Sequence, residues 1–427
     1  MTSAPPTTDT RATAGTNPVS WARARDQDAA VAALRTAVAE AQVPHAWLLV
    51  GEPGLGQQQL VTAFVAALEC EVGGLAAAAL AGEPDGHVLA DEGCGRCRTC
   101  LRVANDSWTG TATFRPEGAQ HLVRQVRDEW VPAATRTGVE GRRRVLRVAA
   151  ADRMNESVQN AFLKVLEEPP PAVVWLLEVE DTTQLLDTIH SRVRRVDLQP
   201  WAPATLRAWA DEELPGGLPE DEADGLVRVA AGSPDRLRAL RTEPRRATRE
   251  LALSTLRVLV EQGPAVVDEL AREVVSHGRA YEKALAEQHD EIAAGLHEQY
   301  GVEKDAELPK GLLRDLKDRW KREQRAARGE PLQAYLDDLG SWLRDLVVVV
   351  GAGGDPGAVV GGLVNRDRLG DLARDAGRFD LPDLFEAVAA VERCRLSLER
   401  NAVGELQLDR LLLTLAGPAF EAARAAR

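Results

Sequence analysis

Three cysteines lie close together in the sequence at the spacing of a metal-binding knuckle. Cys94, Cys97 and Cys100 are separated by two residues each. Thiolates at this spacing on a short turn can converge on one tetrahedral ion, and zinc prefers sulfur ligands. A closed site needs a fourth ligand, for which Cys70 is the first candidate and His87 the second. Four such ligands leave no open position for a reacting group, so the sequence predicts structural zinc and no zinc catalysis.

The cysteine cluster has two other interpretations. A redox Cys-x-x-Cys pair is one, but two overlapping pairs that share Cys97 favour a metal. Free buried thiols are the other. The fifth cysteine of the chain, Cys394, falls in a helical pattern and is expected in a hydrophobic core.

A glycine-rich segment resembles the phosphate-binding template G-x-x-x-x-G-K-[ST] but lacks its last two residues. Gly51 and Gly56 match the template glycines, with Gly54 between them, and Gln57 and Gln58 replace the lysine and the hydroxyl residue. The template lysine neutralises the β- and γ-phosphates, and the hydroxyl binds magnesium. Since glutamine carries no charge, we expect a vestigial phosphate loop that does not hydrolyse ATP. The alternative is a tight strand-to-helix turn that binds nothing, which also needs glycine.

The acidic pair that a nucleotide motor places after its next sheet strand is also missing. The strand expected at 144–150 is followed by Ala151, and the first acid is Asp152. We interpret Asp152 as a cap of the helix that follows, with a displaced catalytic carboxylate as the alternative. Loss of the cation and of the acids together argues against ATP hydrolysis more strongly than either loss alone.

A Ser-Arg pair precedes the last expected strand of the α/β region. Arg192, beside Ser191, lies where an arginine can reach a nucleotide held by a neighbouring subunit, and its planar guanidinium would stabilise a phosphoryl group in transfer. A solvated basic edge that includes Arg194 and Arg195 is the alternative. A second basic group lies at 142–144. Either group could touch nucleic acid, although neither has the interleaved aromatic residues of a base-stacking surface.

Hydrophobic periodicity predicts the elements that position these residues. Up to Pro200 strands alternate with helices, which is typical of a mostly parallel sheet covered on both faces. From there on the pattern is helical, with three short helices in 203–241 and longer ones in 244–427. The expected strands are 46–50, 144–150, 173–177 and 194–198, the expected helices before Pro200 are 26–42, 57–70, 119–131 and 155–168, and later breaks are expected at Pro264, Gly278, Pro309 and 351–357.

Composition narrows the class of protein. The 427 residues are 44% hydrophobic and 28% charged, with a net charge of −14, so bulk charge does not attract nucleic acid. No stretch of about 18 apolar residues is free of charge, so we expect no membrane span. Residues 1–20 have no apolar core and are expected to form a disordered leader and no signal peptide, which makes the cytoplasm the default compartment.

Four segments occur in an order that resembles the bacterial clamp-loader branch of the AAA+ family. The likeness covers about residues 20–240 and is closest to the delta-prime family of DNA polymerase III subunits, in which a degenerate phosphate loop is common. The segments are HAWLLVGEPGLGQQQL at 45–60, CGRCRTC at 94–100, ADRMNESVQNAFLKVLEEPP at 151–170, which is the most specific, and TIHSRVRRV at 188–196.

The resemblance implies a fold and a division into domains. It implies a Rossmann-like AAA+ domain with a zinc module, followed by an all-α lid and an all-α collar. About residues 276–330 look like an insertion in the collar. The implied boundaries are a leader at 1–20, the AAA+ domain at 21–200 with the zinc module at about 70–100, a three-helix lid at 201–243 and a helical oligomerisation collar at 244–427.

The resemblance also implies a function. The chain would be a stator-like subunit without ATPase activity of its own, within the polymerase holoenzyme, that helps to load the sliding clamp (beta) onto primed DNA with gamma/tau and delta subunits. Ser191 and Arg192 fit the family's Ser-Arg-Cys motif, whose arginine acts in trans on ATP held by the adjacent motor subunit, and Val193 replaces the motif's cysteine. The implied zinc ligands are Cys70, Cys94, Cys97 and Cys100.

Two alternatives to this function are an active gamma/tau-type ATPase and a zinc-dependent nucleic-acid-binding protein that forms no ring. ATP hydrolysis by the chain alone would favour the first. Monomeric, salt-sensitive DNA binding that is lost on Cys97→Ser would favour the second, against which the net charge argues.

Overall fold

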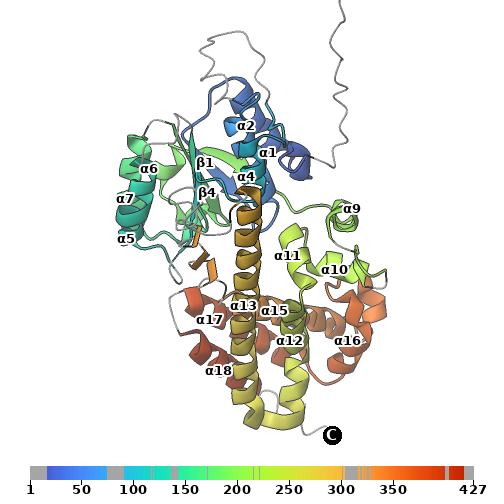
Figure 1. The fold of residues 1–427 in the computed structure, drawn as a ribbon. Coiled ribbons are helices and arrows are strands. Elements are labelled where there is room, and N and C mark those ends of the chain that lie inside the picture. The colour runs from blue at the N-terminus through green and yellow to red at the C-terminus, as the bar shows by residue number, and fades with distance from the viewer. Residues whose placement is uncertain are drawn as a thin grey trace, which may run out of the picture. The chain divides into compact units, whose positions relative to one another are not determined.

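The computed structural model comprises two compact units (Figure 1). We refer to the described residues up to Pro116 and from His121 to Pro200 as the α/β unit, and to those from Trp201 onward, which the short segment 117–120 joins, as the helical unit. The structure describes residues 17–74, 91–116, 118, 120–135, 143–170, 172–214, 216–220, 222–300, 302, 316–317, 320–321, 323–324, 327, 329–399 and 403–417.

The α/β unit is built on a five-stranded sheet in the order β2-β3-β4-β1-β5, in which all neighbours are parallel. Its elements are η1 Trp21–Arg23, α1 Asp28–Ala39, β1 Ala46–Val50, α2 Gln57–Glu69, α4 Arg98–Ala104, β2 Thr111–Phe114, α5 Val123–Gln125, η2 Val126–Trp130, α6 Val131–Thr135, β3 Arg144–Val148, η4 Ala151–Arg153, α7 Glu156–Glu167, β4 Val173–Val179, η5 Thr182–Gln184, α8 Asp187–His190 and β5 Arg194–Asp197.

Successive side chains of β1 point to opposite faces of the sheet, and helices cover both faces. Trp47 and Leu49 pack with α1, α2 and α4 on one face, whereas Leu48 packs with α7 and with the helical stretch 123–135 on the other. The predicted strand at 46–50 is confirmed at both ends. Strand β2 has no counterpart among the predicted strands, because its four residues are only partly buried except for Phe114. The helix predicted at 119–131 instead begins at Val123 and includes a π-helical turn, η2.

The helical unit contains no strand among its described residues. The three short helices predicted in 203–241 are present, and they enclose a small core in which the rings of Trp201 and Trp209 meet edge to face at 6.0 Å. Its elements are α9 Pro203–Glu213, α10 Ala223–Val229, α11 Pro234–Leu240, α12 Glu243–Gln262, η6 Gly263–Val266, α13 Val267–Tyr300, α15 Glu330–Gly351, η8 Pro356–Gly362, η9 Arg366–Arg368, α16 Leu369–Ala376, α17 Leu381–Glu399 and α18 Gly404–Leu415.

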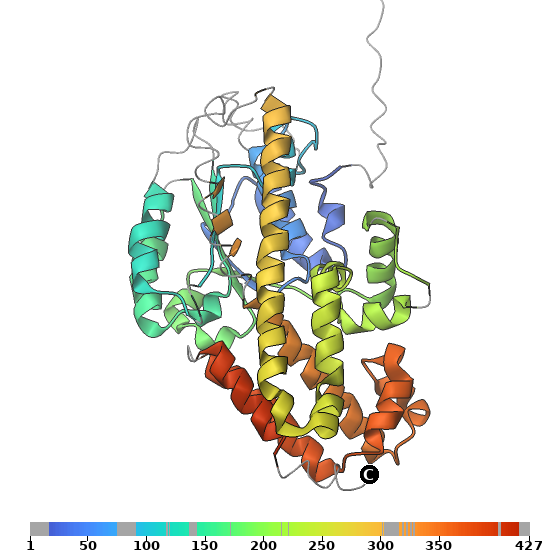
Figure 2. The ribbon, with the colours of Figure 1, turned by 60° about the horizontal axis from the view of Figure 1, so that its bottom comes forward.

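Two of the predicted helix breaks are confirmed and one is wrong. The chain turns at Pro264, in η6, and α15 ends at Gly351. Helix α13, however, continues through Gly278 and lies beside α12 along its first turns (Figure 2). A glycine in a helix costs only about 1 kcal/mol, which tertiary packing readily exceeds. The fourth expected break, Pro309, lies outside the described residues.

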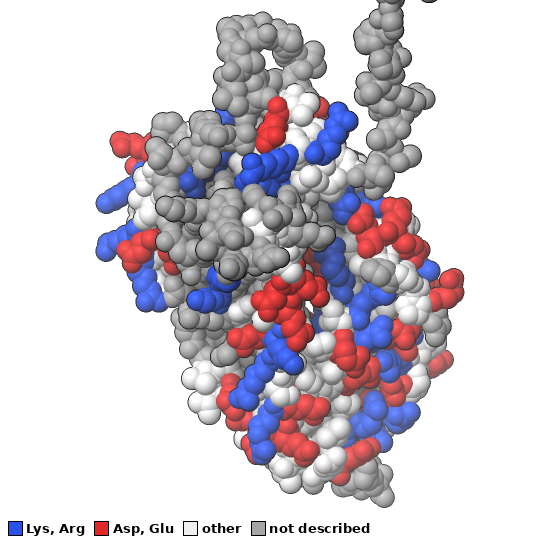
Figure 3. All heavy atoms as spheres, viewed as in Figure 1, with Lys and Arg blue, Asp and Glu red and all other residues white. Residues whose placement is uncertain are grey.

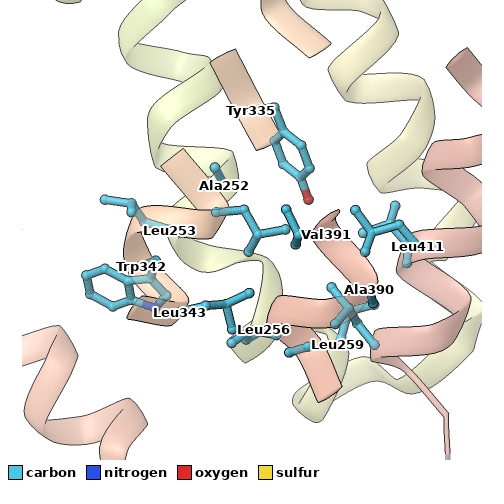
Figure 4. Close-up of a cluster of buried hydrophobic side chains, with 14 of the residues drawn as sticks. Ala252, Leu253, Leu256, Leu259, Tyr335, Trp342, Leu343, Ala390, Val391 and Leu411 are labelled. Atoms are coloured by element: carbon cyan, nitrogen blue, oxygen red, sulfur yellow. The ribbon is translucent and has the colours of Figure 1, made fainter. Parts of the chain in front are cut away.

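The large core of the helical unit is formed by α12, α13, α15, α17 and α18. Figure 4 shows Leu256 of α12, Leu343 of α15, Val391 of α17 and Leu411 of α18 gathered in it. On the face drawn in Figure 3, acidic and basic side chains are interspersed over the helical unit, so the net negative charge does not form a patch of one sign there. Among the described residues, none of the helices combines the length and the apolar composition that a membrane span requires.

A matched pair of leucines tests this core. Leu343 is fully buried, whereas Leu413 of α18 is 54% exposed. Leu343→Ala is expected to lower the free energy of unfolding by about 2–5 kcal/mol, because it removes buried contacts and leaves a cavity. Leu413→Ala is expected to change that free energy by less than about 0.5 kcal/mol. Urea unfolding followed by circular dichroism measures both, and equal losses would contradict the assigned core.

Candidate functional site

The four cysteines predicted to bind metal lie together in the α/β unit. Cys70 ends α2, Cys97 is the N-cap of α4, Cys100 lies in that helix and Cys94 precedes it. Their four Sγ atoms all lie within 4.8 Å of one another, an arrangement that could hold a metal ion. The structure therefore places Cys70, the first candidate for the fourth ligand, beside the other three cysteines. The second choice, His87, lies outside the described residues.

Backbone amides point at the sulfur atoms in sequence along the knuckle. The amides of Cys94, Cys97 and Cys100 donate to the Sγ atoms of Cys70, Cys94 and Cys97 at 3.4, 3.3 and 3.4 Å. A hydrogen bond with the Cys100 side chain lowers the pKa of Cys70 to about 4, and the same contact raises the pKa of Cys100. Amides that donate to sulfur stabilise thiolates, which are the form that binds metal.

The donor set fits zinc. Zinc–sulfur bonds of about 2.3 Å in a tetrahedron place sulfur atoms about 3.8 Å apart, which is compatible with the observed cluster. Cys70 and Cys100 are buried and the other two cysteines are partly buried. Since all four ligands are protein side chains, a bound ion would have a closed coordination shell.

The segment that leads into the cysteine cluster is held by the N-terminal residues of the α/β unit. Asn17 Nδ2 donates to the Gly93 carbonyl at 2.9 Å, and the indole of Trp21 donates to the Asp91 carbonyl at 2.7 Å. The Glu92 carboxylate accepts from the Ser20 hydroxyl at 2.5 Å and from the Trp21 amide at 3.1 Å. These long-range contacts have no local signal in the sequence, and they fix one side of the knuckle.

The glycine-rich turn predicted as a vestigial phosphate loop lies between the end of β1 and the start of α2. Gly56, at φ 105°, precedes the first turn of α2 as its N-cap. A Cβ on Gly51, at φ 156°, would lie 3.0 Å from the Leu198 Cβ. Gln57 is buried, and its side chain folds back on the turn, where its Nε2 donates to the Glu52 carbonyl at 2.6 Å. The position where the template has a cation is thus occupied by a neutral amide bonded to the loop itself.

Arg147 of β3 lies beside the same turn. Its guanidinium donates to Gln58 Oε1 at 2.5 Å and pairs with Glu178 of β4 at 2.7 Å, with both charged side chains largely buried. Gln58 stands where the template hydroxyl binds magnesium. A guanidinium at this place carries positive charge without coordinating oxygen ligands as a metal does. The sequence does not identify Arg147 as part of this arrangement, because the strand pattern predicts its position but not its partners.

No acidic pair follows β3. Ala149 and Ala150 follow the strand, and Asp152 lies in the short helix η4. The predicted cap role of Asp152 is wrong, because the cap of α7 is Asn155, whose side chain accepts from the Val158 amide at 3.1 Å.

A buried histidine supports the end of β3. His121 is fully buried, its Nε2 bonds the Ala149 carbonyl at 2.9 Å, and its ring meets Trp130 edge to face. Burial lowers the pKa of His121 to about 4. The folded chain therefore holds a neutral imidazole at pH values at which an unfolded chain, with a histidine pKa of about 6.5, binds a proton.

This shift predicts acid sensitivity of the α/β unit. As pH falls from about 6.5 to about 4, the unfolded state binds a proton on His121 that the folded state does not. The free energy of unfolding of the wild-type chain should therefore fall by about 3 kcal/mol through this group. His121→Leu should remove that part of the pH dependence while lowering stability at neutral pH. Urea unfolding of both chains at several pH values measures the difference, and parallel pH profiles would contradict a neutral buried His121.

Ser191 and Arg192 occupy the turn between α8 and β5. The Arg192 side chain is one-third exposed, and its Nη1 donates to the Thr188 carbonyl at 2.8 Å and to the Ser191 hydroxyl at 3.2 Å. Its Nη2 pairs with Glu167 Oε1 at 2.8 Å. The predicted neighbours Arg194 and Arg195 are not part of this arrangement: the first covers the Trp47 ring and the second pairs with Asp197.

Gln159 of α7 fastens the segment that leads to Arg192. Its buried side chain donates to the carbonyls of Met154 and Gln184 at 2.8 and 2.9 Å and accepts from the Leu186 amide at 2.8 Å. Leu186 is the N-cap of α8. Gln159 is a polar residue at a core-facing position of an amphipathic helix, and this is the one signal in the sequence that marks it.

The first half of the chain is similar in sequence to subunits of bacterial DNA polymerase III. A family model described as DNA polymerase III, delta subunit, matches residues 26–202. The chain is 32% identical over 225 residues to the DNA polymerase III subunit delta' of Pseudomonas aeruginosa, and the match covers 52% of this chain and 63% of that protein. It is 28% identical over 201 residues to the subunit delta' of Escherichia coli, covering 46% of this chain and 54% of that protein.

A third relative is a different kind of subunit. The DNA polymerase III subunit gamma/tau of Mycobacterium tuberculosis is 27% identical over 224 residues, covering 51% of this chain and 36% of that protein. The matches to the two delta' proteins span between half and two-thirds of their length. The family model and the curated relatives together support a delta-prime-like clamp-loader subunit of DNA polymerase III.

Proposed function

We propose that this chain is a non-hydrolytic, stator-like delta-prime subunit of the DNA polymerase III clamp loader. It helps to load the sliding clamp onto primed DNA in the cytoplasm, as one member of a ring with gamma/tau and delta subunits. The observation that carries this proposal is the combination of a phosphate loop without its cation and an arginine retained on an exposed turn. A motor subunit needs that cation to hydrolyse ATP, whereas a subunit that only serves its neighbour needs only the arginine.

The phosphate loop lacks what hydrolysis requires. The Gln57 amide bonds the loop carbonyl of Glu52 where an ammonium would meet the β- and γ-phosphates. Arg147 and Gln58 stand where magnesium would be held, and alanines follow β3 where a motor has its acids. The loop therefore lacks the lysine, the magnesium ligand and the carboxylate with which a motor subunit stabilises the charge on a transferring phosphoryl group and activates the attacking water.

Arg192 supplies what a neighbouring motor subunit needs. A planar guanidinium with several donors in a fixed fork suits the equatorial oxygens of a transferring phosphoryl group. Ser191 and the Thr188 carbonyl orient one of its terminal nitrogens, and Gln159 fixes the helix from which the turn emerges. Arg192 is thus the residue that acts in trans, and Ser191 is a positioning residue.

Cys70, Cys94, Cys97 and Cys100 would hold a structural zinc ion. When bound, the ion supplies a tetrahedral cross-link between the end of α2 and the start of α4 and performs no catalysis, because no coordination position is open. The helices at 201–243 and 244–427 serve as the lid and the oligomerisation collar of the subunit in this proposal.

The alternative of an active gamma/tau-type motor is favoured by the likeness to the Mycobacterium tuberculosis subunit. ATP hydrolysis by the purified chain separates the two functions. We expect no magnesium-dependent hydrolysis above background, since both halves of the motor's chemistry are missing. Turnover near 1 s⁻¹ or above that is abolished by Gly56→Trp would contradict the stator role.

A further inference from the structure

Both terminal nitrogens of the Arg192 guanidinium have oxygen partners within the chain. Nη1 donates to the Thr188 carbonyl and the Ser191 hydroxyl, and Nη2 pairs with the Glu167 carboxylate at 2.8 Å. Bidentate recognition of a phosphate uses two parallel donors of the same fork. The nitrogen directed at Glu167 is therefore engaged by one anion before it can bind another.

Glu167 lies at a position that is unfavourable for its own helix. It is the last residue of α7, and Glu168 follows it. The carbonyl end of a helix carries partial negative charge, so acidic residues there lower the stability of the helix. Pairing with Arg192 offsets this repulsion. A locally unfavourable residue with a specific long-range partner is expected where function constrains the sequence.

We propose that Glu167 is an internal counter-anion that holds Arg192 in a resting position, and that a phosphate on the neighbouring subunit displaces it. This inference rests on the proposed trans role of Arg192. The carboxylate and the phosphate carry charge of the same sign and compete for the same fork, so the arginine exchanges one for the other when the subunits engage. Glu167 thereby sets how readily the arginine is released.

The exposure of the Arg192 and Glu167 side chains determines how much Glu167 lowers the affinity of the shared site for nucleotide. The Arg192 and Glu167 side chains are 33% and 51% exposed, so their pairing is weak and easily reversed. If Arg192 is free of Glu167 for only a fraction of the time, the apparent affinity of the shared site for nucleotide is reduced to that fraction of its full value. Glu167→Gln keeps the size of the side chain and removes its charge. It is therefore expected to tighten binding of an ATP analogue at the shared site by about two- to fivefold.

The test uses the reconstituted ring of this chain with its cognate motor and delta subunits. A fluorescent, non-hydrolysable ATP analogue is titrated against rings that carry the wild-type chain, Glu167→Gln, Glu168→Gln or Arg192→Ala. Glu168 is the matched control, because it is the adjacent glutamate and is exposed. We expect tighter binding for Glu167→Gln, no change for Glu168→Gln and weaker binding for Arg192→Ala.

A double variant separates a role through Arg192 from a general structural role. If Glu167 acts only on the arginine, Glu167→Gln combined with Arg192→Ala must match Arg192→Ala alone. Equal affinities for Glu167→Gln and Glu168→Gln, or weaker binding with Glu167→Gln, would overturn the counter-anion role. An intact ring in which Arg192→Ala changes nothing would instead contradict the proposed trans function.

Discussion

Arg192→Ala is expected to slow ATP hydrolysis at the site shared with the adjacent motor subunit by about 10³-fold or more, because an arginine acting in trans contributes that much to turnover. Arg192→Lys should recover little of the rate. Lysine keeps the positive charge but lacks the planar fork that binds two phosphoryl oxygens together. Single-turnover hydrolysis in a ring whose other motor sites are inactivated measures the rate at this one site.

Arg195→Ala is the matched control for that experiment. Arg195 lies three residues further along the chain, is more than half exposed and pairs with Asp197. If this edge acts only through its overall positive charge, as the alternative of a solvated basic edge predicts, Arg192→Ala and Arg195→Ala should slow hydrolysis equally. A specific trans role requires that Arg195→Ala keep the wild-type rate, and equal losses in the two variants would contradict it.

Cys97→Ser is expected to remove zinc from the chain and to destabilise the knuckle by several kcal/mol, because the free energy of binding structural zinc contributes directly to folding. Cys97 is also the N-cap of α4, where its side chain accepts from the Cys100 amide. Serine is a favoured N-cap residue and preserves that role. The effect of the substitution therefore reports on the sulfur ligand.

Metal analysis measures the loss of zinc in Cys97→Ser, and thermal unfolding with and without a chelator measures the loss of stability. Cys394→Ser is the control, since Cys394 is buried in the helical unit and lies outside the cysteine cluster. Its zinc content should equal that of the wild-type chain. Wild-type protein prepared without chelators that holds less than about half an equivalent of zinc would contradict a closed four-cysteine site.

The parts of the fold that the sequence predicts are those with a local signal. The run at 46–50 and the glycine turn after it have one compatible structure, a buried strand that enters a helix, and both were predicted at the correct residues. The need for a fourth zinc ligand predicts that Cys70 joins the cluster although it lies 24 positions before Cys94, and the four sulfur atoms do lie together.

The parts that were missed depend on partners far away in the sequence. Strand β2 is short and weakly apolar, so only its pairing with β3 identifies it. The pairing of Arg147 with Glu178 and that of Arg192 with Glu167 join charged residues that lie 31 and 25 positions apart. A charged residue in a strand or at a helix end indicates nothing by itself about its partner, which the topology of the sheet determines.

The central claim is that this chain does not hydrolyse ATP itself but completes the active site of its neighbour. The most direct test is the ATPase activity of the cognate motor subunits, stimulated by the clamp and primed DNA. It is measured with the wild-type chain, with Arg192→Ala and with the chain omitted. Since other sites in the ring keep their own arginines, we predict a severalfold fall for Arg192→Ala in a ring that still assembles. An unchanged rate in an intact ring would contradict the claim and leave the chain as a scaffold.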